Sequence, residues 1–477
     1  MSHRGTLSWY RDLTIKRGPQ MVSHGGTVNK AQIGIGYLAK LTPWNGRGGF
    51  ALEGIVKVLK RLGDPQDSYP TIHIAGTNGK GSVSSGISSI LGSAGYRVGL
   101  NSSPHLQSLN ERIVIDGSPI GSTALGEFCH DVRAAAGKAL VELSFHEAIT
   151  VVSFLAFREI GVEWAVVEVG LGGRLDASNV ISRPAATAIV TIDYDHQAIL
   201  GNTLAEIATE KAGIIKHGCP VVSGLLPEEA EKVVHRKAMG ARHYRFGTDY
   251  GVAPSQDGTG RTFGYWGKDF PVTQMSRFNF TSPLAGNHQG HNLAVAATLG
   301  LVLGMDETSV KRGLEGVFWP ARLEQLEVEG ISLLMDCAHN TAGIRAFLEY
   351  VCSKETKPID LTFGVLDTKN WAEMIQVLAP YVGHWRLVLP ASERALPLEQ
   401  VREQLMVSGS DVKISSYGSN YELLIRDLLD NSSEGVRYIT GSMYMVGKIR
   451  DILGLPVKPL WNKTLKQNAV FASDPSS

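Results

Sequence analysis

The chain has 477 residues, with 46 basic and 46 acidic side chains, so its formal net charge is zero. A balanced charge gives no overall attraction to nucleic acid or to an anionic membrane surface, and we expect neither as a partner. Hydrophobic residues make up 43% of the chain, which is enough for two or three domains with their own cores. The four cysteines have no close pairing and no metal-ligand spacing, the first residues lack a signal-peptide pattern, and no apolar run could span a bilayer. We therefore expect a cytoplasmic protein.

Residues 1–48 mix aromatic, glycine and basic residues without sustained periodicity, which indicates an N-terminal lead-in arm. An amphipathic pattern then begins at Phe50 and predicts a helix that ends at Gly63. The most informative stretch follows at residues 72–82, where a β-branched run enters a turn with three glycines and a lysine. A helix pattern leaves this turn, so the stretch predicts a strand, a phosphate loop and a helix.

The predicted loop carries the groups that a nucleotide phosphate site needs. Glycines let backbone N–H groups close on phosphate oxygens, Lys80 supplies a positive charge, and Ser82 offers a hydroxyl to Mg²⁺. The spacing differs from the common Walker pattern, because Gly81 separates the lysine from the serine. The alternative is a glycine-rich turn that only caps a helix. We favour nucleotide binding by Gly76, Thr77, Asn78, Gly79, Lys80, Gly81 and Ser82.

Polar residues also follow the next predicted strands. The strand at 97–100 runs into a loop that contains Ser103, and the strand at 186–192 runs into Asp195 and His196. Ligands of open α/β sheets bind at the carboxyl ends of parallel strands. Glu168 interrupts an apolar strand, and a buried carboxylate needs a cation or several donors, so either a metal or a salt bridge would satisfy it. His196 is either a structural histidine or a ligand.

Two predicted helices begin with capping boxes, in which a hydroxyl residue is followed three positions later by glutamate. The first begins at Ser144 and runs to about residue 160, and for its Glu147 we favour capping over a chemical role. The second spans residues 203–216 and carries Lys211 on its apolar face. This lysine either extends its amine to solvent or is desolvated with a lowered pKa, which would make it reactive.

The second half of the chain predicts an insert and then a further domain. Residues 237–283 have short β-like runs typical of a hairpin or meander, and residues 318–322 resemble a hinge. Strands then alternate with helices again, which predicts a second, smaller α/β domain. The predicted units are a lead-in arm at 1–48, an ATP-binding domain at 49–318, a C-terminal domain at 319–462 and a polar tail at 463–477.

In chain order, these motifs resemble the folylpolyglutamate synthase and dihydrofolate synthase family of the Mur ligase superfamily. The resemblance covers residues 50 to 455 and rests on the segments 76–82, 103–106, 168–177, 195–196, 210–214, 285–289, 322–324, 338–340, 394–397 and 440–442. It implies an α/β fold, with a P-loop-containing central domain of the Mur-ligase type and a smaller Rossmann-like C-terminal domain. It also implies an ATP-dependent amide ligase, in which a substrate carboxylate forms an acyl phosphate that the amine of L-glutamate then attacks.

The resemblance also assigns residues. The acceptor would be dihydropteroate or a reduced folate, the cofactors ATP and Mg²⁺, and the chain a monomer. Catalytic roles fall to Lys80, Glu168, His196 and Lys211, and Lys211 matches a lysine that is carbamylated in the family. The expected metal ligands are Ser103, Glu168 and His196. Beyond the loop, nucleotide contacts fall to Asn292, Arg322, Asp336 and His339. The expected acceptor site comprises Ser144, Phe145, His146, Leu175, Asp176 and Ala177.

Two departures from the family pattern fall near the acceptor site. His146 stands where the family has a phenylalanine, and Ser108 stands where arginine is common. A second hypothesis therefore keeps the ligase chemistry but joins the amino acid to a non-folate carboxylic acid. A third hypothesis, a nucleotide-binding protein without catalysis, would predict damage at the catalytic positions, all of which are intact.

Overall fold

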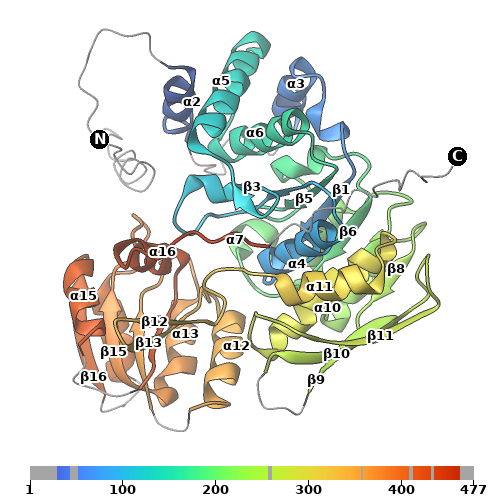
Figure 1. Ribbon diagram of the computed structural model, residues 1–477. Helices are drawn as coiled ribbons and strands as arrows, with labels where there is room; N and C mark the ends of the chain where they lie inside the picture. The colour runs from blue at the N-terminus through green and yellow to red at the C-terminus, as the bar shows by residue number, and fades with distance from the viewer. Residues whose placement is uncertain are drawn as a thin grey trace, which may run out of the picture.

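The computed structural model describes residues 29–42, 52–255, 260–355, 358–407, 412–430 and 435–461. Most of the expected lead-in arm, and the tail at 463–477, lie outside the described residues. Figure 1 shows a large central domain and a smaller C-terminal domain, each with helices around a sheet. Within the described ranges, no helix has the length and apolar character needed to cross a membrane.

The central domain is built on an eight-stranded sheet in the order β4-β3-β2-β5-β1-β6-β7-β8. Its strands are β1 (Thr71–Ala75), β2 (Val98–Asn101), β3 (Ile113–Ile115), β4 (Ser118–Pro119), β5 (Trp164–Glu168), β6 (Ala186–Ile189), β7 (Val221–Ser223) and β8 (His243–Arg245). The six strands from β2 to β8 in this order are parallel, and β3 is antiparallel to both of its neighbours, β2 and β4. Since β1 lies in the middle and is fully buried, the loop that follows it opens at the centre of the carboxyl edge.

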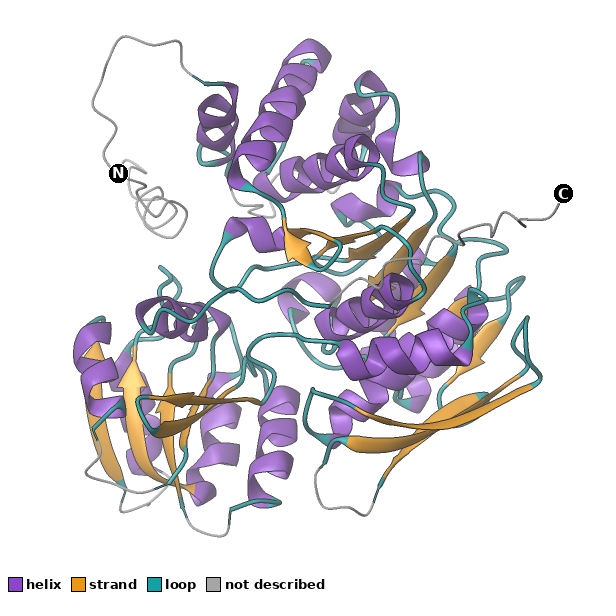
Figure 2. Ribbon diagram, viewed as in Figure 1, coloured by secondary structure: helices purple, strands orange, loops and turns teal. Residues whose placement is uncertain are grey.

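Helices cover both faces of this sheet (Figure 2). One face packs against α4 (Lys80–Ser93), α10 (Asn287–Val302) and α11 (Glu307–Gly316), and the other against α3 (Glu53–Arg61), α5 (Ser122–Ala139) and α6 (Phe145–Ile160). Small residues bring α4 and α10 together, because a Cβ built on Gly86 would lie 2.9 Å from the methyl carbon of Ala296. Three further helices, α7 (Gln197–Leu200), α8 (Leu204–Lys211) and α9 (Glu228–Lys237), pack with residues of β1, β6 and β7.

Helix α2 (Lys30–Leu38) lies in the segment for which the sequence predicted no element. Asn29 caps it, since its side chain accepts a hydrogen bond from the N–H of Ala31. The helix contacts α5 through glycine, because a Cβ on Gly34 would lie 1.8 Å from the carbonyl oxygen of Gly126. This close backbone contact explains why α2 carries little apolar periodicity.

The insert predicted at residues 237–283 forms a second, three-stranded antiparallel sheet, which confirms the meander. Its strands are β9 (Tyr250–Pro254), β10 (Thr262–Lys268) and β11 (Met275–Thr281), in the order β11-β10-β9. It packs on α10, where the hydroxyl of Tyr265 lies 2.9 Å from that of Thr298. The first strand of the same stretch, β8, joins the main sheet instead.

The C-terminal domain has a six-stranded sheet in the order β12-β13-β17-β14-β15-β16. Its elements are β12 (Glu324–Val328), β13 (Ile331–Met335), α12 (Thr341–Cys352), β14 (Ile359–Phe363), α13 (Trp371–Leu378), β15 (Val382–Val388), α14 (Leu398–Val407), β16 (Lys413–Gly418), α15 (Tyr421–Leu428), β17 (Arg437–Thr440) and α16 (Met443–Ile452). Only β12 is antiparallel to its neighbour. The alternation of strands and helices that the sequence predicted for this domain is confirmed.

The chain crosses between the two domains twice. After the hinge segment 318–322 and the whole C-terminal domain, residues 453–461 return to the central domain (Figure 1). There Leu460 donates a hydrogen bond to Gly117 O and accepts one from the N–H of Phe318. Trp461 is 2% exposed and belongs to the central core. The predicted C-terminal unit therefore ends inside the core of its neighbour.

Candidate active site

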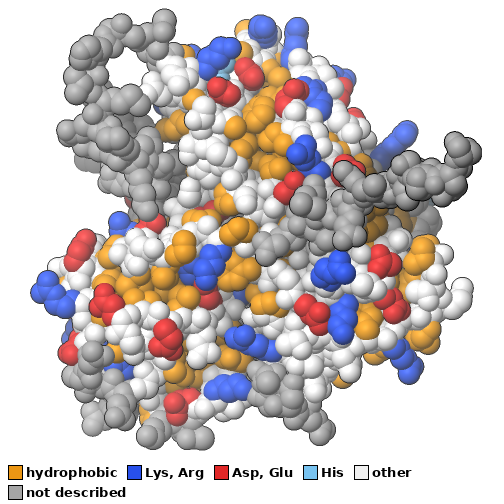
Figure 3. All heavy atoms as spheres, in the orientation of Figure 1, with side chains coloured by type: hydrophobic (Ala, Val, Ile, Leu, Met, Phe, Trp, Pro, Cys, Tyr) orange, Lys and Arg blue, Asp and Glu red, His pale blue; other side chains and the backbone are white. Residues whose placement is uncertain are grey.

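A cleft of about 680 Å³ lies between the carboxyl edge of the main sheet and the C-terminal domain. Acidic and basic side chains are interspersed on the face shown in Figure 3, in keeping with the balanced charge. The structure brings the expected phosphate, metal and nucleotide residues to this one cleft. They are Gly76, Thr77, Asn78, Gly79, Lys80, Gly81, Ser82, Ser103, Glu168, His196, Lys211, Asn292, Arg322, Asp336 and His339.

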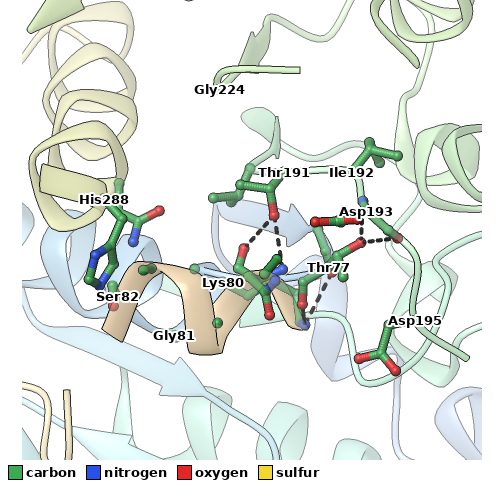
Figure 4. A pocket seen from close by; sticks show the side chains of 18 of the residues that line it. Thr77, Lys80, Gly81, Ser82, Thr191, Ile192, Asp193, Asp195, Gly224 and His288 are labelled. Carbon is green, nitrogen blue, oxygen red and sulfur yellow. Dashed lines mark hydrogen bonds between the residues drawn. The ribbon is translucent and has the colours of Figure 1, made fainter. Parts of the chain in front are cut away.

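The loop before α4 is fastened to the loop after β6 (Figure 4). Thr77 donates its N–H to Thr191 O at 2.8 Å, and Asn78 donates its N–H to Thr191 Oγ1 at 2.9 Å. Thr77 Oγ1 in turn accepts the N–H of Asp193 at 3.1 Å. The loop backbone is thus held before any ligand binds. The sequence gave no reason to single out Thr191, whose role depends on the pairing of β1 with β6.

Two loop glycines are required by close neighbours. Gly79 has a φ of +79°, and a Cβ there would lie 2.3 Å from the side-chain oxygen of Asn292. A Cβ on Gly81 would lie 2.7 Å from the indole ring of Trp319. Any side chain at these positions would displace the first turn of α4.

Two lysines converge on one carbonyl oxygen. Lys80 and Lys211 place their Nζ atoms 3.2 Å and 3.1 Å from Gly76 O. Lys211 is only 5% exposed, and burial, reinforced by the positive charge of Lys80, lowers its pKa to about 7. Of the two alternatives, desolvation is therefore confirmed. The lowered pKa brings loss of the proton from this amine toward neutral pH, and the neutral amine can act as a nucleophile.

Glu168, at the end of β5, is 4% exposed, and its Oε2 atom has no hydrogen-bond partner in the described part of the chain. Burial raises its pKa to about 7, although Lys80 and the N–H of Ser103 oppose the shift. A buried carboxylate without a full set of donors is costly, so this side chain is suited to a cation.

The donors around Glu168 fit magnesium. Ser103 and Ser82 offer hydroxyls and His196 an imidazole at the same cleft. The described ranges hold no cluster of three or more histidine, cysteine and acidic side chains that would hold a metal alone. Magnesium does not require one, since it keeps several waters and binds through one or two carboxylates together with substrate phosphates.

His196 follows β6 with a left-handed φ of +53°, which turns the chain sharply into the cleft. Burial lowers the pKa of His196 to about 4, Asp195 opposes this shift, and Lys369, Lys211 and Lys80 reinforce it. The imidazole is therefore neutral at pH 7, as a metal ligand must be.

The comparisons with known proteins agree along most of the chain. Residues 74–300 match the Mur ligase middle domain. A folylpolyglutamate synthase from Lacticaseibacillus casei is 34% identical over 417 residues, which cover 84% of this chain and 93% of that protein. This chain belongs to the folylpolyglutamate synthase and dihydrofolate synthase family. A dihydrofolate synthetase from Saccharomyces cerevisiae is 31% identical, covering 83% of this chain and 96% of that protein. The folylpolyglutamate synthase of Mycobacterium tuberculosis, solved with ADP, is 28% identical with a TM-score of 0.79, covering 90% of this chain and 99% of that one.

Within this member of the family, several polar contacts join the domains across the cleft, and two of them are short. Lys369 Nζ lies 2.8 Å from Asp195 Oδ1, and both side chains are nearly buried. Asn340 donates to Asn78 Oδ1 at 2.9 Å. The sequence analysis did not select Lys369 or Asn340 as site residues. Both residues follow predicted strands, β14 and β13, and residues beyond the carboxyl ends of parallel strands commonly line ligand sites. This position could have identified them from the sequence.

The C-terminal wall of the cleft presents three of the residues that the family resemblance implied. Asp336 accepts the N–H groups of Leu323 and Ala338, and burial raises its pKa while Arg322 opposes the shift. His339 Nδ1 lies 2.9 Å from a carbonyl oxygen, so Nδ1 carries the hydrogen and Nε2 is left as an acceptor. This wall can therefore bind a ligand through both a cation and a neutral imidazole.

The residues expected at the family's acceptor site lie beside the cleft rather than among its lining residues. Glu147 accepts the N–H and hydroxyl of Ser144 at 2.8 and 2.7 Å, which confirms the capping role. His146 Nε2 lies 3.1 Å from Asp176 Oδ2. The His146 ring lies against Gly170, whose backbone does line the cleft. The second departure from the family pattern, Ser108, caps a short 3-10 helix.

Proposed function

We propose that this protein joins L-glutamate to the carboxylate of dihydropteroate or of a reduced folate, with ATP as the energy source. One observation carries the proposal. A phosphate loop, a buried carboxylate at Glu168 whose Oε2 has no hydrogen-bond partner among the described residues, and a buried lysine with a lowered pKa, Lys211, meet in one cleft. A simple nucleotide-binding protein needs only the first of these. The full-length relatives are named for both glutamate-adding activities, which supports dihydropteroate and folates alike.

The proposed roles follow from charge and position. Lys80 and the N–H groups of residues 77–82 bind the β- and γ-phosphates. Ser103, Glu168 and His196 would hold Mg²⁺, which when bound supplies charge neutralisation for the transferring phosphoryl group. The nucleotide is also contacted by Asn292, Arg322, Asp336 and His339. The acceptor carboxylate attacks the γ-phosphorus, ADP leaves, and the amine of glutamate then displaces phosphate from the acyl phosphate.

We propose that Lys211 is carbamylated in the active protein. Its neutral amine forms an N–C bond with CO₂ and loses one proton, so that a cation becomes an anion. The lowered pKa of about 7 supports this step, since a fully protonated amine has no lone pair to donate. An anion at this buried position would also offset the charge of Lys80.

The acceptor acid is proposed to bind along Ser144, Phe145, His146, Leu175, Asp176 and Ala177. A second candidate function, ligation of glutamate to a non-folate aromatic acid, is favoured by one observation: the ring presented at this wall is an imidazole. We also propose that the protein acts as a monomer, which light scattering after size exclusion would test.

The test is phosphate release with ATP, Mg²⁺ and L-glutamate in the presence of dihydropteroate, tetrahydrofolate or no acid, with the new amide identified by mass spectrometry. Turnover that requires both a pteroate acid and glutamate supports the proposal. Lys80→Ala should lower it by about 10²–10³-fold. Turnover only with other aromatic acids would favour the second candidate. Absence of turnover in protein that binds ATP would refute both.

A further inference from the structure

Arg450 lies on α16 of the C-terminal domain, and its side chain is only 1% exposed. Two of its nitrogens bind two different segments of the chain. Nη1 donates to Oε2 of Glu324, which follows the hinge directly, and Nε donates to Oε1 of Gln107 at 3.0 Å. Gln107 belongs to the central domain, in the loop after β2. One buried guanidinium therefore joins the hinge to a loop of the other domain.

The carboxylate of Glu324 also fixes the shape of the hinge. Its Oε2 accepts the N–H of Ala321 at 2.8 Å, and Asp336 accepts the N–H of Leu323 at 3.0 Å. Ala321 and Leu323 have left-handed φ values of +53° and +49°, and strained residues of this kind persist only where other contacts hold them. Arg322 stands between them and lines the cleft. The direction of its side chain thus depends on the turn that Glu324 helps to hold.

The loop that Gln107 belongs to also carries Ser103, one of the proposed magnesium ligands. Glu111 keeps this loop rigid, since its carboxylate accepts three consecutive backbone N–H groups at 2.8, 3.0 and 2.7 Å. The loop is packed directly on α16, because a Cβ on Gly447 would lie 1.9 Å from the carbonyl oxygen of Leu106. A shift of α16 would therefore move the whole loop.

Stability alone is a poor explanation for the buried pair of Arg450 and Glu324. Desolvation offsets the attraction between two buried charges, and apolar residues of similar volume in their place are often neutral or stabilising. We propose that Arg450 is a positioning residue that fixes Arg322 toward the nucleotide and Ser103 toward magnesium. Arginine suits this task, since its planar fork directs donors to two partners, whereas lysine has a single charged nitrogen. This inference rests on the nucleotide and magnesium sites of the proposed function.

Two variants separate the contacts of Arg450 without leaving a buried charge unpaired. The double variant Arg450→Met/Glu324→Met removes both charges, so it should keep most of its stability. Gln107→Met leaves the ion pair in place and removes only the bond to the loop. The matched control is Arg386→Met. Arg386 is also buried and pairs with two aspartates of the C-terminal domain, none of which lines the cleft.

The experiment measures binding of AMPPCP, an ATP analogue with an uncleavable β–γ bridge, by calorimetry over a range of Mg²⁺ concentrations. At saturating Mg²⁺, the double variant should bind AMPPCP about tenfold more weakly, which corresponds to one misplaced charged contact. It should also need about tenfold more Mg²⁺ for half of the full binding. Gln107→Met should need more Mg²⁺ but reach wild-type affinity. Arg386→Met should bind as the wild type does, although it unfolds at a lower urea concentration.

Three results would overturn the inference: wild-type affinity in the double variant, wild-type Mg²⁺ dependence in Gln107→Met, or equal weakening in Arg386→Met. Because the measurement needs no acceptor acid, each of these results would leave the ligase function intact. Absence of amide formation by a protein that shows the expected binding pattern would refute the proposed function alone. A wild-type protein that does not bind AMPPCP with Mg²⁺ would refute both.

Discussion

Lys211 and Glu168 are buried in the cleft, and the charge on each lowers the free energy of unfolding. Substitutions that remove these charges should therefore abolish activity and yet stabilise the fold. Lys211 has a pKa lowered to about 7, so its cation is disfavoured in the folded state. Lys211→Met should abolish ligase activity. Below pH 7, where both folded and unfolded wild-type chains carry the charge, it should raise the free energy of unfolding by roughly 3 kcal/mol. Urea unfolding at pH 6 checks this, and a destabilised variant would contradict it.

The pKa of Glu168 is shifted in the opposite direction from that of Lys211. Its pKa is raised to about 7, so the folded state binds a proton that the unfolded chain has already released. Stability without magnesium should therefore fall as the pH rises from about 4.5 to 7. Glu168→Gln should remove that slope and be more stable above pH 7 by about 3 kcal/mol, while phosphate release falls at least a hundredfold. Unfolding curves at pH 5 and pH 8 in EDTA compare the two proteins, and parallel slopes would refute the assignment.

Single residues were also where the sequence was most informative. The capping role of Glu147 followed from spacing, and helical periodicity placed Lys211 on the apolar face of its helix, but periodicity left open whether its amine is desolvated or extends to solvent. The sequence did not decide the partner of Glu168, because either a metal ion or a basic side chain would compensate the charge of a buried carboxylate.

At the scale of elements, helix α2 shows what local pattern misses. It packs through backbone contact at Gly34 rather than through an apolar stripe. Gly34→Ala should separate α2 from α5 and expose its amides to hydrogen exchange. Gly36→Ala is the matched control on the same helix, since nothing lies within 4 Å of its Cβ, and it should stabilise by about 0.5–1 kcal/mol through helix propensity. Equal protection of α2 amides in both variants would refute this account.

The returning segment at residues 453–461 is a second element that pattern could not assign. Trp461 fills a space beside Gly92, where a Cβ would lie 2.7 Å from its indole nitrogen. Trp461→Ala should destabilise the central domain by about 3–5 kcal/mol. Val457→Ala, on the same segment but 41% exposed, should change stability by less than about 0.5 kcal/mol. Chemical denaturation of both variants measures the difference. A Trp461→Ala protein as stable as the control would show that the segment is only lightly held.

At the scale of the whole molecule, the sequence analysis divided the chain into domains but could not predict which residues of the two domains meet. Parallel strands place their carboxyl ends at one edge, so each half of the cleft could be assembled from patterns. The pairings of Asn78 with Asn340 and of Asp195 with Lys369 depend on how the two domains are set against each other. The hinge at residues 318–322 was recognised from the sequence, but the return of residues 453–461 to the central domain was not.

The Asp195–Lys369 pair is the stronger of these contacts. Burial would raise the pKa of Asp195, but Lys369 and His196 hold it well below its ordinary value, so the pair is charged at neutral pH. Lys369→Met leaves a nearly buried carboxylate unpaired and should weaken the closed arrangement. Because a closed cleft keeps water from the acyl phosphate, the variant should release more phosphate per amide formed. Lys311→Met, which removes a surface pair with Glu315, should keep the wild-type ratio. A ratio in Lys369→Met equal to that of the control would mean that closure does not depend on this pair, and that the two chain crossings suffice to hold the cleft shut.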